Sequence, residues 1–151
     1  MNLSNHFTLE ELIDSESART LNIDNTPSPD EIENLRALCV NVLEPIRVEF
    51  DRPVVINSGF RCARLNIAIG GVSSGQKTSQ HVLGQAADIV IPGIPVQLLF
   101  DRIKNGNFVK GFDQLIQEFN RWVHVSFAAG RNRNQALMAY KLDGKSHYEE
   151  V

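Results

Sequence analysis

The strongest constraint on the fold is a helix start at Ser28-Pro29-Asp30-Glu31, followed by apolar residues at helical spacing. The start combines a serine at the N-cap, a proline at the first helical position, early acidic side chains and a reciprocal glutamate three residues on. The apolar residues that follow recur at steps of three and four, which predicts one apolar face that packs on a sheet. They are Ile32, Leu35, Leu38, Cys39, Val42 and Ile46. Pro45 should kink or end this helix.

The remaining segments predict shorter helices and a sheet. Thr8 and Glu11 have the spacing of a capping box, so a short helix should follow Thr8. Further helices are expected at 63–69 and 96–104, strands at 53–56, 86–91, 112–119 and 122–127, and a closing hairpin at 136–142 and 146–151. Because helices come first and strands mostly follow, we predict an α+β fold: a central antiparallel sheet with N-terminal helices packed on one face.

The composition limits the class of protein. With 151 residues, of which 42% are apolar and 22% charged, the chain is expected to form a single soluble domain over residues 1–151. Its net charge of −3 argues against a nucleic-acid partner. There is no basic and apolar leader and no apolar run of about 18 residues, so we expect no signal peptide and no membrane insertion. We also expect a monomer that is cytoplasmic when made, with Cys39 in the core and Cys62 free and partly exposed.

Two of the four histidines lie in segments that suggest chemistry. His81 follows a small, polar loop at 72–80, which we expect to be mobile, and it precedes Asp88 by seven residues. Gly84 would let the chain between them fold back, so that the imidazole and the carboxylate could converge. In the strand WVHVSF the side chains alternate, and His124 lies on the face opposite a fully apolar one.

Two imidazoles and one carboxylate are the protein ligands of an open catalytic zinc site, in which a fourth position is left for water. Taken singly, His124 would more often be a hydrogen-bonded histidine in a half-buried strand, and Asp88 a residue of a strand start or turn. Spacing alone therefore leaves both interpretations open. His6 and His147 lie in polar surroundings near the ends of the chain and are interpreted as surface residues.

Three blocks of sequence resemble one known family. SGFR, SQHVLGQAADI and WVHVSF occur in this order, and they resemble the zinc D-Ala-D-Ala carboxypeptidase and L-alanyl-D-glutamate endopeptidase family, whose pattern is S-G-[YF]-R, S-x-H-x-x-G-x-A-x-D and a final [WV]-H on a strand. The segments LSNHFTLEEL and IDNTPSPDEIENLRALCVNVLEPIR resemble the front half of a compact, often phage-borne branch. The resemblance covers nearly the whole chain and implies a hedgehog-like, D-Ala-D-Ala-peptidase-like fold.

The resemblance implies roles for the matching residues. His81, Asp88 and His124 would be ligands of Zn²⁺, which would lower the pKa of a bound water and polarise the scissile carbonyl. Arg61 would stabilise the oxyanion or hold a substrate carboxylate. Ser79 matches the serine two residues before the first ligand and would hydrogen-bond the substrate.

The general base departs from the better-known branches. Several members carry a glutamate three residues before the last histidine, and here that position is Arg121, which cannot accept a proton. Glu118, at the end of the strand expected to pair with WVHVSF, is the nearest candidate, provided that the register turns it toward the metal. Otherwise it is a solvated glutamate at a strand end. Asp113 and Gln117 are weaker candidates.

These assignments predict a zinc metallopeptidase that hydrolyses peptide bonds in peptidoglycan stem peptides, with either carboxypeptidase or endopeptidase specificity. Trp122, on the same strand face as His124, would form a wall of the substrate cleft or else be a core tryptophan. In a phage or prophage setting the enzyme, an endolysin, would reach the cell wall after release from the cytoplasm. The alternatives are a catalytically silent wall-binding or virion protein that keeps the fold and metal, and a zinc hydrolase of free D-Ala-D-Ala dipeptide.

Overall fold

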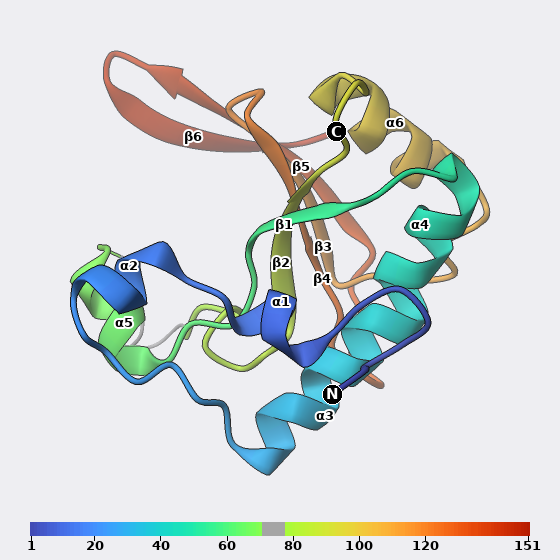
Figure 1. Cartoon of the computed structure of the whole chain (residues 1–151). Helices are drawn as coiled ribbons and strands as arrows, with labels where there is room; N and C mark the ends of the chain where they lie inside the picture. Colours follow the sequence, from blue (N-terminus) through green and yellow to red (C-terminus); the bar gives the residue numbers. More distant parts are fainter. Residues whose placement is uncertain (71–77) are drawn as a thin grey trace.

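The computed structural model describes residues 1–70 and 78–151, so most of the loop predicted at 72–80 lies outside the described residues. Within these residues the chain forms a six-stranded sheet with the order β1-β2-β4-β3-β5-β6 (Figure 1). The strands are β1 (Val55–Ser58), β2 (Ala86–Val90), β3 (Gln114–Glu118), β4 (Trp122–Ser126), β5 (Gln135–Leu142) and β6 (Lys145–Glu150). The strands predicted from apolar and alternating runs are thus all present.

Neighbouring strands are antiparallel except for β3 and β5, which are parallel. The predicted α+β fold with a mostly antiparallel sheet is therefore confirmed, and the parallel pair is its exception. The exception follows from where β4 ends. The carbonyl of Ser126 accepts a hydrogen bond from the amide of Asp113, directly before β3, so the chain leaves β4 at the start of β3. It then crosses this end of the sheet and begins β5 beside the start of β3, which makes the two strands run the same way.

Seven helical segments accompany the sheet in the described parts of the chain. They are α1 (Leu9–Ile13), α2 (Glu16–Thr20), α3 (Pro29–Leu38), the π-helical segment η1 (Cys39–Leu43), α4 (Glu44–Phe50), α5 (Ala63–Ala68) and α6 (Val96–Asn105). Both predicted capping boxes are present, at Thr8 with Glu11 and at Ser28 with Glu31. The short helix α2, capped by Ser15, has no apolar periodicity long enough to be recognised in the sequence. None of the described helices is long and apolar enough to cross a membrane.

The long helix does not end at Pro45. The chain stays helical as far as Phe50, and the five residues before Glu44 widen into a π-helical turn, in which the amide of Glu44 donates to the carbonyl of Cys39. Proline has no amide hydrogen and crowds the preceding turn, so a local change of hydrogen-bond register accommodates it inside a helix. The helix finally ends at Asp51, whose φ of 49° is left-handed.

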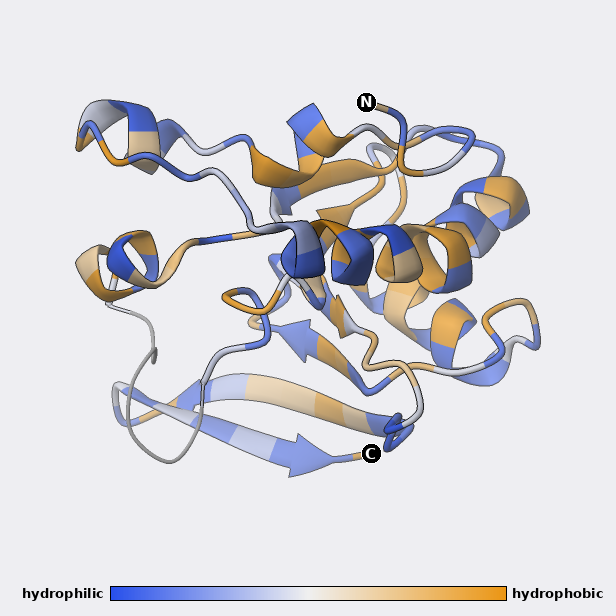
Figure 2. Cartoon of the chain, turned by 90° about the horizontal axis from the view of Figure 1, so that it is seen from below, coloured by the Kyte–Doolittle hydropathy of each residue, from blue (hydrophilic) through white to orange (hydrophobic). Residues whose placement is uncertain are grey.

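The long helix and α6 cover one face of the sheet (Figure 1). In Figure 1, α3, α4 and α6 lie on the same side of β2, β3 and β4. Figure 2 shows hydrophobic residues along the central strands and the facing helices, whereas β6 is largely hydrophilic. Cys39 is buried in this core, Cys62 is partly exposed, and both are free. The core joins Leu35, Leu38, Val42 and Ile46 of the long helix, Leu99, Phe100 and Ile103 of α6, and Ala87, Ile89, Leu115, Val123 and Val125 of the strands. The alternate side chains of β2, β3 and β4 therefore project from the opposite, open face.

The crossing from β4 to β5 is held by one buried carboxylate. Asp113 is 3% exposed. Its two carboxylate oxygens accept hydrogen bonds from the guanidinium group of Arg133 at 2.8 Å each, and one of them also accepts from the amide of Arg133 at 3.0 Å. These bonds lower the pKa of Asp113 although burial opposes the shift. The ion pair fixes the start of β5 beside the start of β3.

We predict that Asp113→Asn lowers the free energy of unfolding by about 1–2 kcal/mol at pH 7, because charge-assisted bonds to a partly exposed arginine are lost. The folded-state pKa of Asp113 lies below its unfolded value, so this stabilisation is present above about pH 4 and is lost as the pH falls through the folded-state pKa. Urea unfolding over this pH range measures the difference. Asp143→Asn, in the exposed turn between β5 and β6, is the control; a difference between Asp113→Asn and wild type that does not shrink in acid would contradict the assignment.

Candidate metal centre

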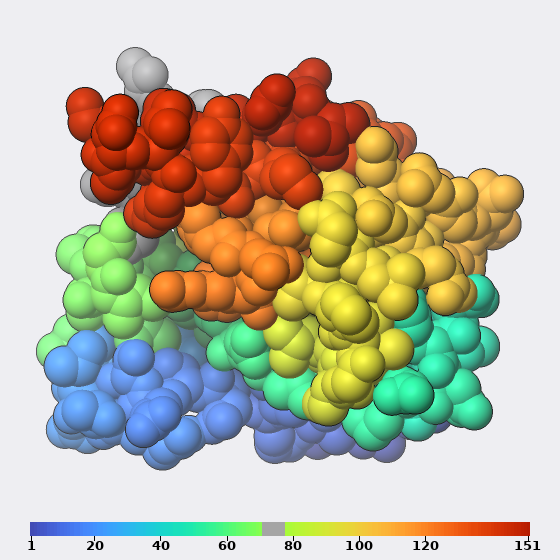
Figure 3. All heavy atoms as spheres, turned by 90° about the horizontal axis from the view of Figure 1, so that it is seen from above, coloured from blue at the N-terminus to red at the C-terminus, as the bar shows by residue number. Residues whose placement is uncertain are grey.

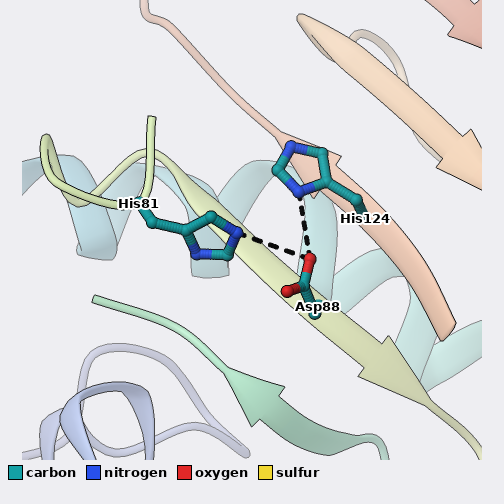
Figure 4. Close-up of side chains that lie close together, drawn as sticks. All are labelled: His81, Asp88 and His124. Carbon is teal, nitrogen blue, oxygen red and sulfur yellow. Dashed lines mark hydrogen bonds and ion pairs between the residues drawn. The ribbon is translucent and has the colours of Figure 1, made fainter. Parts of the chain in front are cut away.

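Three side chains meet on the open face of the sheet (Figure 4). Asp88 projects from the middle of β2, and His124 lies directly opposite it on β4. Cross-strand partners point to the same face, so this register alone brings the carboxylate to the imidazole. His81 comes from the turn just before β2 and reaches over the same carboxylate. The structure thus brings together the trio predicted as metal ligands.

The donor atoms of the three side chains all lie within 4.8 Å of one another. Asp88 Oδ1 lies 3.0 Å from His124 Nδ1 and 3.4 Å from His81 Nε2. Ligand bonds of about 2.0–2.2 Å at tetrahedral angles place neighbouring donors roughly 3.3–3.6 Å apart. The pair of Asp88 and His81 already has this separation, and Asp88 and His124 would move slightly apart to bind zinc. All three residues are buried, at 3% (His81), 6% (Asp88) and 9% (His124) exposed. Nitrogen and carboxylate donors in this number leave a further coordination position for water or substrate.

The electrostatics of the group suit a cation. Burial opposes the ionisation of Asp88, but hydrogen bonds from His124 and His81 outweigh it, and the pKa of the carboxyl falls well below its usual range. Burial also lowers the pKa of His81, which keeps its imidazole neutral. Burial would lower the pKa of His124, but the hydrogen bond to Asp88 and the negative charges of Asp88 and Glu118 outweigh it and raise this pKa. A raised pKa favours the protonated imidazole, so protons compete with a metal ion for His124 and metal affinity should fall in acid.

The backbone of the SGFR segment orients His81. Its Nδ1 lies 2.8 Å from the carbonyl oxygen of Gly59, which can only accept, so this nitrogen carries the hydrogen and Nε2 is left to face Asp88. The amide of Arg61 in turn donates to the carbonyl of His81 at 3.1 Å. Position 59 must be glycine, since a Cβ there would lie 2.2 Å from the carbonyl oxygen of Leu12. The sequence pattern located SGFR but gave no sign that its glycine carbonyl supports the first histidine.

The turn that carries His81 is fixed against helix α3. Gly84 has a φ of +72°, which confirms that the chain folds back here, and a Cβ at this position would lie 2.6 Å from the carbonyl oxygen of Glu31. The side-chain amide of Asn34 also donates to the carbonyl of Leu83 at 2.8 Å. Ser79 Oγ accepts a hydrogen bond from the amide of His81 at 3.3 Å. The matched serine therefore has a local role in the turn, and its contact with substrate stays a prediction.

Arg61 lies at the β1 side of the centre. Its Nη1 donates to Ser58 Oγ at 3.1 Å, and Ser58 is the cross-strand partner of Asp88. Burial lowers the pKa of Arg61, while the charges of Asp88 and Glu118 oppose the shift. Its buried Nε has no hydrogen-bond partner among the described residues. Arg61 and Ser58 also line an open cavity of about 490 Å³ between β1 and helix α2. An anionic group of a ligand in this cavity could therefore pair with the guanidinium.

Glu118 is turned toward the centre by the β3–β4 register. It lies opposite Trp122 across a tight turn, and its Oε1 is 3.5 Å from His124 Nδ1. Burial raises the pKa of Glu118, and the charge of Asp88 adds to the shift, while His124, Trp122 and Arg61 oppose it. A raised pKa makes this carboxylate a better proton acceptor near neutral pH. The indole nitrogen of Trp122 is buried without a hydrogen-bond partner among the described residues.

The other candidates for the base lie elsewhere. Asp113 is bound to Arg133 at the far end of β3. Gln117 faces the helices and donates to Gln97 of α6. Arg121, in the usual glutamate position, is exposed at the turn. The remaining histidines are also apart from the centre, with His6 beside Glu44 and His147 stacked on Tyr140.

The buried His-Asp-His group on the open face of the sheet could hold a metal ion. Comparison with family models matches residues 5–126 to Peptidase M15. The match covers most of the chain, and the protein therefore belongs to the Peptidase M15 family of metallopeptidases, as the sequence motifs predicted. A search of curated proteins finds no match. The matched segment includes Arg61, Glu118 and the three candidate ligands, and it ends before the hairpin β5–β6.

We predict that the purified protein binds one zinc ion and that His81→Ala weakens binding by at least about 100-fold, since loss of a direct ligand should exceed the 10- to 100-fold cost of losing an outer partner. Competition with a chromophoric chelator measures the affinity, and elemental analysis measures the content. His147→Ala is the matched control. Equal zinc affinity in the two variants would exclude His81 as a ligand.

The turn at Gly84 gives a second prediction. Gly84→Ala should lower the free energy of unfolding by more than about 2 kcal/mol, because backbone strain and the contact with Glu31 add. Gly130 also has a positive φ, +77°, but no atom lies within 4 Å of its Cβ position. Gly130→Ala should therefore cost only about 1–2 kcal/mol of strain. Urea unfolding of both variants measures the difference, and equal losses would show that the contact with α3 is unimportant.

Proposed function

We propose that this protein is a zinc-dependent peptidase that hydrolyses peptide bonds in the stem peptides of peptidoglycan, as a D-Ala-D-Ala carboxypeptidase or an L-Ala-D-Glu endopeptidase. The observation that carries the proposal is the position of Glu118, 3.5 Å from His124 on the same sheet face as the His-Asp-His group. A carboxylate beside a metal centre in a member of the Peptidase M15 family is the partner that peptide hydrolysis needs.

In this proposal His81, Asp88 and His124 hold the metal. When bound, zinc supplies Lewis-acid chemistry: it acidifies water and polarises a carbonyl group. Asp88 stays ionised because its pKa is lowered, and His81 presents Nε2 because Gly59 holds the hydrogen on Nδ1. The protein thus offers one negative and two neutral donors, which leaves the bound cation with net positive charge toward a substrate carbonyl.

Glu118 acts as the general base. It accepts a proton from the attacking water and returns it to the departing amine, so the reaction needs no covalent bond between enzyme and substrate. Arg61, on the other side of the centre, offsets negative charge on the substrate, either on the oxyanion or on a terminal carboxylate. The stem peptide carries several carboxylates, which can pair with the guanidinium of Arg61 where it lines the cavity beside β1.

The proposed setting is lysis of a bacterial cell by a phage or prophage. It is supported by the resemblance of the first 50 residues to a compact, often phage-borne branch of the family. In this setting the protein would meet its substrate only after release from the cytoplasm. A catalytically silent wall-binding protein is the competing function, and the loss of glutamate at position 121 is the observation in its favour.

The deciding experiment is mass spectrometry of the products released from purified peptidoglycan by the zinc-loaded protein. Glu118→Gln keeps the size of the side chain but removes its basicity, and it should lower kcat by about 10²–10⁴-fold. Glu149→Gln is the control, because Glu149 is exposed on β6 and pairs with Met138, which points away from the centre. Chelator should abolish the wild-type reaction.

The product masses identify the bond that is cut. Loss of a terminal alanine would assign the carboxypeptidase specificity. Release of the peptide by a cut after its first residue would assign the endopeptidase specificity. If the zinc-loaded protein releases no product from any type of peptidoglycan, the peptidase is excluded and the wall-binding function is favoured. If Glu118→Gln retains full activity, Glu118 is not the base.

A further inference from the structure

The hairpin β5–β6 lies outside the segment matched by the family, yet it extends the sheet directly beside the proposed catalytic residues. Trp122 is opposite Glu118, Glu118 is opposite Ala139 on β5, and Ala139 is opposite Tyr148 on β6. Partners in such a row project to the same face of a sheet. Tyr148 therefore lies on the open face, in line with Glu118 and Trp122.

The residue between Glu118 and Tyr148 is small. Only the methyl group of Ala139 stands between them, so a long side chain on β6 can extend over β5 toward β3. Ala139 is 2% exposed although none of the described helices covers it, which agrees with neighbouring side chains closing over it. Space-filling Figure 3 shows the hairpin, in red, directly beside the orange residues of the β3–β4 region.

The phenol of Tyr148 is close enough to Glu118 and Asp88 for their negative charges to affect its pKa. Burial raises the pKa of Tyr148, and the negative charges of Glu118 and Asp88 add to the shift. The hydroxyl group is therefore protonated at neutral pH and can donate a hydrogen bond. The residue is nevertheless 55% exposed, so the donor is open to a ligand. Tyr140 on β5 differs: it points to the other face and stacks on His147, with ring centroids 5.5 Å apart.

We propose that Tyr148 is a substrate-binding residue, whose hydroxyl group donates a hydrogen bond to the backbone of a stem peptide lying between the metal centre and the hairpin β5–β6. This inference rests on the proposed function. The strand that carries Tyr148 is three strand spacings from β4, roughly 14 Å. Tyr148 therefore meets the part of the peptide away from the bond that is cut. Its contact is the same in the ground state and the transition state, and it lowers KM without changing kcat.

The test compares wild type, Tyr148→Phe and Tyr140→Phe, each as the full chain loaded with zinc. A synthetic stem pentapeptide is the substrate. Tyr148→Phe should raise KM about three- to tenfold, the effect of one uncharged hydrogen bond, with kcat within about twofold of wild type. Tyr140→Phe should have the KM and kcat of wild type. Zinc content and the thermal midpoint of unfolding should be the same in all three proteins.

Two results would overturn the inference: an unchanged KM in Tyr148→Phe, or a higher KM that accompanies lower zinc content or a lower thermal midpoint, since the effect would then be structural. If wild type cleaves no pentapeptide, the proposed function fails, and calorimetric titration of wild type and Tyr148→Phe with the pentapeptide decides the inference separately. Weaker binding by the variant supports the contact with Tyr148. Equal binding, or none to either protein, refutes it.

Discussion

The pairing of β2 with β4 is the constraint on which the rest of the centre depends, because it sets Asp88 opposite His124. The metal donors do not determine this register. On the other face of the same strands, Ala87, Ile89, Val123 and Val125 are fully buried against the helices. A slip of one residue would turn these apolar side chains to the open face and the two donors into the core. The hydrophobic core thus positions the chemistry that lies on the opposite side of the sheet.

The remaining parts of the centre are attached to this pair by backbone contacts. His81 has no place in the sheet, and its orientation depends on the carbonyl of Gly59 and on a turn that packs closely on α3. Both contacts need glycine. Gly59 has no room for a Cβ, and Gly84 has no room for a Cβ and also has a left-handed φ. Burying Asp88 between two imidazoles opposes stability unless a cation compensates for the charge. The turn that carries a proposed ligand is therefore held by close backbone contacts.

The register of β3 against β4 explains how a chain with Arg121 in the usual glutamate position still places a carboxylate beside the metal centre. The turn between β3 and β4 is tight, with left-handed Phe119 and Asn120, and it sets Glu118 opposite Trp122. Glu118 therefore shares a face with His124 from the neighbouring strand instead of from the same strand. The hairpin β5–β6 continues this row to Tyr148 and widens the open face beyond the part common to the family.

The sequence by itself determined the features that local patterns encode: the capping boxes at Thr8 and Ser28, the apolar face of the long helix, the alternation around His124 and the ligand motifs. It could favour Glu118 among the candidates for the general base. It could not show that this side chain points toward the metal centre, because its direction depends on a strand register set by packing. Only the tertiary structure decided the parallel course of β5, the π-helical turn before Pro45, the bond from His81 to Gly59 and the alignment of Tyr148 with Glu118. Each of these joins segments through contacts, or adjusts a helix to its packing, and side chains brought together from distant positions leave no periodic signal along the chain.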